Sequence, residues 1–186
     1  AETSIARGTW TDGVYYNATA GFNFTPPENW LLADDEYIAQ LVGVSKEMLG
    51  TEGEDLSDHE VVYDTFVQNP DNGTNVFIIY QKVSMLGALG IGIGDIMEEI
   101  VKQMGENTAM NCTYVGTTEQ TLGSTDYQCA EFDVDISGIT IKQYILVNKF
   151  MNYTTNITIT AMASEPIEEF LPMFTSAQTA MADCCG

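Results

Sequence analysis

The segment from residue 110 to residue 162 constrains the fold most strongly, because it is a run of β-strand patterns separated by short turns. Within residues 128–136 an apolar side chain at every second position alternates with Glu131, Asp133 and Asp135. Such alternation places one set of side chains on each face of a sheet, and turn residues between the runs are typical of an antiparallel meander. The strands predicted from the pattern cover residues 110–118, 125–136, 139–149 and 153–162.

The last of these strands separates its side chains by polarity. Tyr153 and Ile157 share one face, whereas Thr154, Asn156 and Thr158 share the other. A sheet with one polar face usually exposes that face to solvent. We therefore expect the polar row of this strand to contact water.

An earlier hairpin has a different pattern. Residues 61–68 and 75–83 flank the turn sequence NPDNG, and both strands carry apolar residues on both faces. Strands of this kind require cover on two sides. Helical spacing of apolar residues occurs at 34–42, 95–105 and 164–181, although Pro172 interrupts the last segment. These patterns predict an α+β fold, with a central antiparallel sheet of about six or seven strands and helices packed on its faces.

The length of 186 residues is sufficient for one core and predicts one domain. We expect a single globular domain over residues 10–181, a flexible N-terminal tether over 1–9 and a loose C-terminal tail over 182–186. The polar start fits a chain that follows a signal or lipid-anchor segment.

The charge of the chain excludes some partners. Six Lys and Arg residues stand against 27 Asp and Glu residues, which gives a net charge of −21. A strongly negative field repels phosphate backbones and anionic lipid headgroups, so we expect neither nucleic acid nor acidic membranes as partners. No run approaches the ~18 apolar residues of a transmembrane helix, and no transmembrane segment is expected.

The cysteines leave several pairings open. Cys112 and Cys129 could pair within their hairpin, or one of them could bond to Cys184 or Cys185 near the C-terminus, and free thiols are an equal alternative. There is no C-x-x-C pair, and a single histidine, His59, cannot complete a common zinc site. We therefore expect no structural metal.

The most acidic stretch is TEGEDLSDHE, residues 51–60. Dense carboxylates could bind calcium, but the alternating ligands, central glycine and distal glutamate of an EF-hand loop are missing. A solvated acidic loop is the simpler interpretation. A calcium-binding module remains an alternative hypothesis for the function.

Catalytic motifs are absent from the sequence. A Ser–His–Asp type triad needs a histidine, and His59 lies between two acidic residues without a G-x-S-x-G or H-E-x-x-H motif. No catalytic residue and no cofactor are therefore predicted, although an unrecognised hydrolase remains a second alternative. Four aromatic residues near the N-terminus could line a ligand-binding platform, with core packing as the simpler explanation: Trp10, Tyr15, Tyr16 and Trp30.

A motif in this same region resembles the opening of a known group of proteins. The pattern Y-x-N-x-x-x-G-F-x-F-x-x-P-x-x-W is matched by Tyr15, Asn17, Gly21, Phe22, Phe24, Pro27 and Trp30. Together with the order of elements across residues 10–181, it resembles the PsbP/Mog1-like fold, in particular small exported proteins or lipoproteins of Gram-positive bacteria. The resemblance implies an α/β/α sandwich and an extracytoplasmic location, secreted or anchored at the cell surface. It implies no functional residue, because the motif residues are mostly structural.

From these observations we expect a non-catalytic extracytoplasmic domain. Its expected role is to bind an unidentified protein or surface partner, or to assist a cell-surface assembly. The sequence does not identify that partner.

Overall fold

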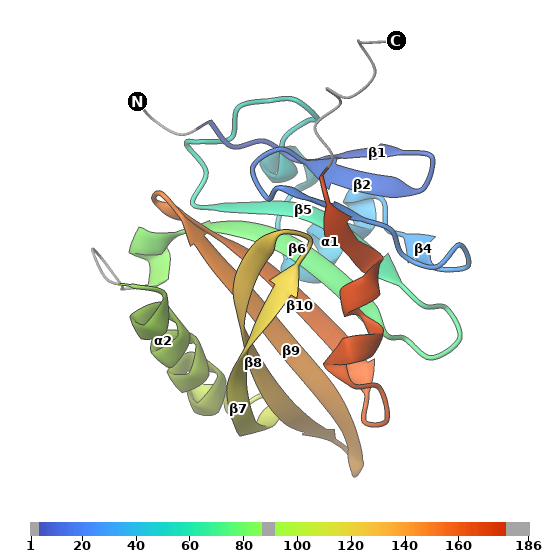
Figure 1. The fold of residues 1–186 in the computed structure, drawn as a ribbon, viewed down its shortest axis with the longest axis vertical. Helices are drawn as coiled ribbons and strands as arrows, with labels where there is room; N and C mark the ends of the chain where they lie inside the picture. The colour runs from blue at the N-terminus through green and yellow to red at the C-terminus, as the bar shows by residue number, and fades with distance from the viewer. Residues whose placement is uncertain (1–3, 87–91, 178–186) are drawn as a thin grey trace.

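A computed structural model describes residues 4–86 and 92–177, and it contains a large sheet with a smaller sheet packed across it (Figure 1). The large sheet has seven strands in the order β4-β5-β6-β10-β9-β8-β7, and every neighbouring pair is antiparallel. Its strands are β4 (Leu31–Leu32), β5 (Val61–Gln68), β6 (Asn75–Lys82), β7 (Asn111–Leu122), β8 (Thr125–Ile136), β9 (Ile139–Phe150) and β10 (Tyr153–Met162).

The meander predicted from the sequence is present in this sheet. Strands β8 and β10 have the predicted bounds, and β7 runs four residues further than expected, to Leu122. Gly123 and Gly138 occupy the turns on either side of β8 with φ angles of 63° and 84°. Glycine adopts this left-handed region without the steric penalty that a Cβ atom brings, so these residues permit the tight reversals.

The smaller sheet has four antiparallel strands in the order β1-β2-β3-β11. Three of them come from the N-terminal region and the fourth from the end of the described chain, so the two ends of the domain meet in one sheet. The strands are β1 (Thr9–Thr11), β2 (Val14–Asn17), β3 (Phe22–Phe24) and β11 (Phe174–Ser176).

The main core lies between the two sheets. The first and last segments contribute Tyr15, Phe22 and Phe174, and the large sheet contributes Ile78 and Ile157, all of them buried. The rings of Phe22 and Phe174 are 5.2 Å apart and nearly perpendicular. Aromatic side chains bury large apolar areas, so this cluster holds the small sheet onto the large one.

The two α-helices lie on the other face of the large sheet. Helix α1 (Asp35–Val42) begins after Asp34, whose side chain accepts a hydrogen bond from the Tyr37 N–H, and packs Ile38 near Phe66 of β5. Helix α2 (Ile93–Glu106) packs Ile96 against Phe132 of β8. Both helices were expected from the sequence, at 34–42 and 95–105.

The expectation of an α+β fold, an α/β/α sandwich with helices on the faces of one central sheet, is wrong. The molecule is mainly β-structure with two antiparallel sheets, and one face of the large sheet is covered by the second sheet rather than by helices. The helix expected over residues 164–181 is also wrong within its described part: two short 3-10 turns, Ile167–Glu169 and Leu171–Met173, lead into β11. Pro172 lacks an N–H group and cannot continue an α-helix at this point.

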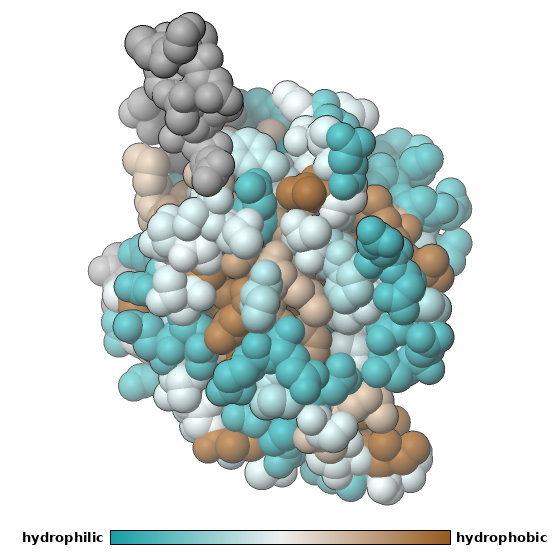
Figure 2. Space-filling view, turned by 45° about the vertical axis from the view of Figure 1, so that its right-hand side comes forward, coloured by the Kyte–Doolittle hydropathy of each residue, from teal (hydrophilic) through white to brown (hydrophobic). Residues whose placement is uncertain are grey.

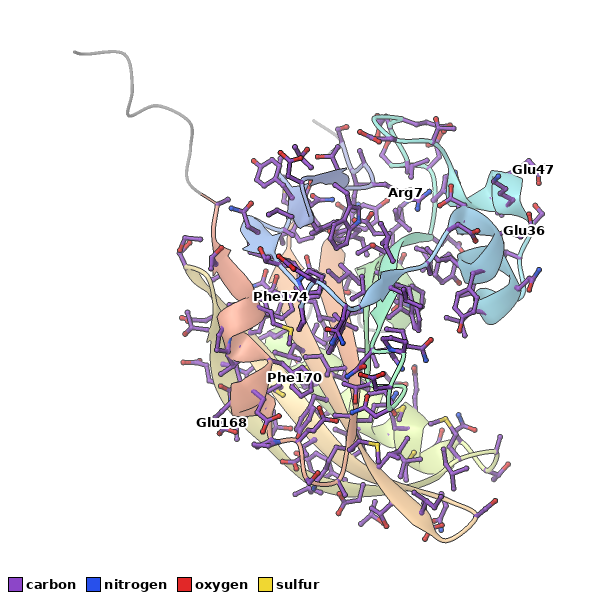
Figure 3. All side chains as sticks on the ribbon, turned by 90° about the vertical axis from the view of Figure 1, so that its right-hand side faces the viewer. Arg7, Glu36, Glu47, Glu168, Phe170 and Phe174 are labelled. Atoms are coloured by element: carbon purple, nitrogen blue, oxygen red, sulfur yellow. The ribbon has the colours of Figure 1, made fainter. Side chains whose placement is uncertain are left out.

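This C-terminal segment still buries its apolar side chains. Figure 3 shows Phe170 and Phe174 on the side of the sheet and Glu168 on the outer side. An irregular segment can therefore provide the same apolar contacts that the sequence pattern assigned to a helix.

Two further expectations are corrected by burial. In place of a flexible tether over residues 1–9, the described part of that segment is packed: Ile5 is fully buried and β1 begins at Thr9. The polar row of β10 is exposed only in part: Thr154 and Asn156 are buried and bond to Gln81 of β6, whereas Thr158 is half-buried. Residues 182–186 lie outside the described part of the chain.

Within residues 4–86 and 92–177, no helix has both the length and the apolar character needed to cross a bilayer.

Candidate functional site

A β-bulge in strand β5 turns Asp64 into the space between the two sheets. The register between β5 and β6 shifts between Tyr63 and Thr65, which leaves Asp64 as the extra residue. Bulges re-aim a side chain and are over-represented next to active sites. The Asp64 side chain is 2% exposed, so its carboxylate must find partners within the protein.

Three groups from the N-terminal region bind this carboxylate. The Gly8 N–H donates to Oδ1 at 2.9 Å and to Oδ2 at 3.0 Å. The Tyr15 hydroxyl donates to Oδ2, and the Asn17 side-chain amide donates to the same oxygen at 3.3 Å. The Tyr15 hydroxyl also lies 2.6 Å from the Tyr80 hydroxyl. Thus Tyr15 and Asn17, two residues of the N-terminal sequence motif, hold Asp64 in place.

Arg7 joins this network to helix α1. One guanidinium nitrogen, Nη2, donates to Asp35 Oδ1 at 2.8 Å and to the Asp64 carbonyl at 2.9 Å. The other, Nη1, donates to Asp35 Oδ2 at 3.1 Å and to the Gly50 carbonyl at 3.3 Å. Nε lies 4.0 Å from Asp64 Oδ1. The guanidinium is therefore engaged by protein groups on both of its terminal nitrogens and is not left to bind an anionic ligand.

The pKa directions in this network agree with a structural role. Burial raises the pKa of Tyr15 and of Tyr80 well above the ordinary value of 10.0, so both remain protonated hydrogen-bond donors. Burial also raises the pKa of Asp64. The hydrogen bond from Arg7 lowers the pKa of Asp35. Only the shift of Asp64 is toward neutral pH, and its largest cause is burial.

A cavity of about 240 Å³ lies next to the network. Its lining includes Trp10, whose indole N–H donates to Thr65 Oγ1 at 3.1 Å. No cysteine, histidine, lysine or serine is among the described residues that line it. The residues around the cavity are Arg7, Gly8, Trp10, Leu32, Ala33, Asp35, Ile38, Glu52, Asp64 and Thr65.

The four predicted ligand-platform aromatics do not form one surface. Tyr15 is fully buried and binds Asp64, while Tyr16, the next residue in β2, is 43% exposed. Trp10 packs against Tyr15 with ring centroids 5.7 Å apart, and Trp30 is half-buried against the main core. Tyr15 is buried in the core and Tyr16 points to the opposite face of β2, so the two rings do not form one platform.

Of the alternatives that the sequence left open for Cys112 and Cys129, a bond between the two is excluded. Both are free thiols, and the ladder of β7 and β8 places Cys112 opposite Val134 but Cys129 opposite Thr118. Cys129 faces the main core, whereas Cys112 packs near α2. A disulfide needs Cα atoms within about 7 Å, which this separation does not allow. Cys184 and Cys185 lie outside the described residues.

The acidic loop at residues 51–60 uses its carboxylates to fix its own turns. Glu54 accepts hydrogen bonds from the Thr51 N–H and hydroxyl, and Asp55 accepts one from the Ser57 N–H. Among the described residues, no three His, Cys, Asp or Glu side chains gather as a metal site would require. His59 lies within this loop, and its carbonyl accepts a hydrogen bond from the Tyr153 hydroxyl.

An exposed apolar surface lies beside the buried network, at one edge of the large sheet. It consists of Leu31 and Leu32 of β4 with Tyr37 and Leu41 of α1, and we call it the β4–α1 surface. These four side chains are between 44% and 62% exposed. Leu31, Leu32 and Tyr37 line a cavity of about 250 Å³ together with Phe66, whose ring centroid is 5.6 Å from that of Tyr37. Leu41 lies outside this lining, one helical turn beyond Tyr37.

Acidic residues border this surface. Asp34 lines the cavity, Glu36 is the exposed neighbour of Tyr37, and Figure 3 shows Glu36 and Glu47 on the same side of the molecule. Figure 2 shows apolar residues as separate areas within a largely hydrophilic face. The helical spacing of Tyr37 and Leu41 was visible in the sequence, but β4 was not predicted, so the surface as a whole was missed.

Comparisons with known proteins show the fold. No family model matches the chain, and no curated protein matches it. The solution structure of cyanobacterial PsbP (CyanoP) from Synechocystis sp. PCC 6803 is similar over 95% of this chain and 96% of that one, with a TM-score of 0.53 and 11% identity. A crystal structure from Bacteroides thetaiotaomicron VPI-5482 covers 93% of this chain and 49% of its own, with a TM-score of 0.44 and 14% identity. The chain therefore has a PsbP-like fold.

Proposed function

We propose that this protein is a non-catalytic, extracytoplasmic domain that binds a basic protein partner through the β4–α1 surface. The observation that carries the proposal is the exposure of Leu31, Leu32, Tyr37 and Leu41 as one apolar surface. Clustered exposed apolar residues with a polar rim are typical of sites of protein association. Exposed apolar residues scattered singly over a protein surface are normal and do not indicate a binding site.

The charge of the surroundings defines the partner. Asp34 and Glu36 border the surface, and the whole chain carries a net charge of −21. A partner that presents Lys or Arg beside aliphatic or aromatic side chains matches both features. Acidic partners would be repelled, and the attraction to a basic one should weaken as salt is added.

The buried network around Asp64 supports a binding role rather than a catalytic one. Arg7 and Asp35 tie the start of α1 to the bulge in β5, and this fixes the helix that carries Tyr37 and Leu41. A surface held on rigid elements loses less conformational entropy when a partner binds. The network thus serves as a support for the β4–α1 surface.

The extracytoplasmic location is proposed from the sequence motif. Its residues resemble those of small exported proteins or lipoproteins of Gram-positive bacteria, and the PsbP-like fold is compatible with that resemblance. Protease treatment of intact cells producing an epitope-tagged chain tests the location. Cleavage of the tag without cell lysis is expected, whereas full protection would contradict it.

The binding proposal can be tested by selecting a displayed random peptide library on the purified protein. Leu31→Asp places a charge in the centre of the surface, and Ile139→Asp is the matched control because Ile139 is also 62% exposed but lies at the start of β9. The selected peptides should be rich in Lys or Arg next to apolar residues. They should bind the Ile139→Asp variant normally and lose binding to the Leu31→Asp variant. Equal binding to both variants would refute the proposal.

A further inference from the structure

The opposite edge of the large sheet is long and lacks a strand partner within the described residues. Strand β7 ends the strand order, has 12 residues and pairs only with β8. All of its residues except Leu122 are at least partly exposed. An edge strand presents unpaired N–H and C=O groups that can pair with another extended segment. Proline or lysine commonly blocks such edges, and neither occurs in β7. A bulge between Tyr114 and Gly116 interrupts the ladder, so the regular part of the free edge is residues 117–122.

The turn after β7 determines which amides face outward. Gly123 and Ser124 form a two-residue loop, so Leu122 and Thr125 are the closing pair of the hairpin. In this geometry the closing pair exchanges hydrogen bonds, and every second pair beyond it does the same. The amides of Thr117, Glu119 and Thr121 therefore point away from β8. Those of Thr118 and Gln120 point toward it.

A cavity lies where this edge meets helix α2. Figure 1 shows α2 alongside β7 and β8. Residues of all three elements line a cavity of about 420 Å³ between the helix and the sheet edge. Its apolar lining comes from Met97 and Val101 of α2 and from Tyr114 of β7, whose ring is 46% exposed. Its polar lining comes from Gly94, Glu98, Lys102, Thr117 and Gln128.

A helix beside a free sheet edge is the arrangement that binds peptides by strand addition. Main-chain hydrogen bonds to the edge give affinity, and a pocket for alternate side chains gives specificity. We propose that an extended segment of a partner protein binds along β7 as an eighth strand and places an aliphatic side chain in the cavity between α2 and β7. This site is separate from the β4–α1 surface, which lies at the other edge of the sheet.

The acidic residues of β8 indicate which side chains the bound segment would carry on its face away from α2. On the face of β8 away from α2, Glu131, Asp133 and Asp135 follow one another at every second position. Lys142 bonds to Glu131 at 2.8 Å and to Asp133 at 2.6 Å, so the group retains a net negative charge. The segment that fits has aliphatic residues alternating with Lys or Arg. A second copy of this chain would bring another charge of −21 and is disfavoured.

The test is hydrogen exchange measured residue by residue by NMR, with and without a synthetic hexapeptide in which Val or Ile alternates with Lys or Arg. In the free protein the amides of Thr117, Glu119 and Thr121 should exchange rapidly and those of Thr118 and Gln120 slowly. Addition of the peptide should slow the first three at least tenfold. A peptide of the same composition with a proline at its centre should produce no such protection, because proline has no N–H to donate.

A variant of the protein provides a second readout. Thr121→Pro removes an outward amide at a residue that does not line the cavity, and an edge position that faces solvent tolerates proline. It should weaken peptide binding at least tenfold, while Thr121→Val, which keeps the amide, should bind normally. Binding by Leu31→Asp should also be unchanged, which separates this site from the proposed function. Uniform protection along β7, or outward amides already protected in a dimer detected by sedimentation, would overturn the proposal.

Discussion

The hydroxyl oxygens of Tyr15 and Tyr80 lie 2.6 Å apart and connect β2 of the small sheet to β6 of the large one. The two residues are separated by 65 positions in the sequence. The Tyr15 hydroxyl also donates a hydrogen bond to Asp64, which lies at the bulge of β5. A chain of buried hydrogen bonds thus spans both sheets at the point where they cross.

The Asp64→Asn substitution tests the strength of this chain. It removes the charge that faces Arg7 and replaces one acceptor oxygen by an amide group, which cannot accept from Gly8, Tyr15 and Asn17 together. Breaking a buried charged network of this kind is expected to lower the free energy of unfolding by about 2–4 kcal/mol. Urea denaturation measures the change. Asp58→Asn, at an exposed position, should shift it by less than about 0.5 kcal/mol.

The buried tyrosines predict loss of stability at alkaline pH. Burial raises the pKa values of Tyr15, Tyr80 and Tyr127 in the folded protein above the ordinary value of 10.0. The unfolded chain therefore binds fewer protons than the folded protein above pH 10, and the stabilisation that is complete below pH 10 is lost as the pH rises further. Each such tyrosine should contribute a slope of about 1.4 kcal/mol per pH unit.

The Tyr127→Phe variant provides the control for this pH dependence. It keeps the ring in the core and removes one ionisable hydroxyl. Denaturation curves measured between pH 9 and 11 should show a shallower decline for the variant, by about half a proton on average and approaching one proton at pH 11. An identical slope in both proteins would show that Tyr127 ionises normally in the folded state.

A close backbone approach at Gly123 predicts an unusually costly alanine substitution. A Cβ atom at this position would lie 2.9 Å from the Thr175 carbonyl oxygen of β11, and the φ angle is 63°. Gly13 has a similar φ of 77° but no atom within 4 Å of a Cβ. Gly13→Ala should therefore lose only about 1 kcal/mol for its conformation. Gly123→Ala should lose roughly 1–3 kcal/mol more, because β11 must shift. Equal losses would mean that β11 is not seated against this turn.

The free thiols should differ in reactivity. Burial raises the pKa of Cys129 to about 12, whereas Cys112 is only partly buried. At pH 8 roughly one Cys129 in 10,000 would then be a thiolate, and its side chain is also shielded from reagents. Peptide mapping after iodoacetamide treatment should find Cys112 alkylated and Cys129 modified only after unfolding. A peptide containing Cys112 joined to Cys129 would contradict the register of β7 and β8.

The sequence was most informative where structure is local. Alternation located β8 and β10 at both ends, and the spacing of Ile96 and Ile100 identified α2. The second sheet was not predictable in the same way, because β11 was hidden in a segment whose Phe170 and Phe174 spacing also fits a helix. The choice between helix and strand for this segment depends on the pairing of Phe174 in β11 with Phe24 in β3, which are far apart in the sequence.

The candidate sites depend on contacts distant in sequence. Nothing near Asp64 in the sequence indicates that residues 7–17 bind it, since the bulge arises from the pairing of β5 with β6. The β4–α1 surface was missed because two residues, Leu31 and Leu32, are too few to show strand alternation. Tyr15 was predicted as part of a ligand platform, but in the structure it is buried and its hydroxyl donates a hydrogen bond to Asp64.

The dissociation constant of a selected basic peptide, measured for the Leu31→Asp and Ile139→Asp proteins, tests the proposed function most directly. A charge buried at the centre of the β4–α1 surface should cost about 2 kcal/mol of binding free energy, or about 30-fold in Kd. The Ile139→Asp protein should remain within about twofold of the wild type. A Kd that rises equally in both variants, or in neither, would contradict the assignment of this surface as the binding site.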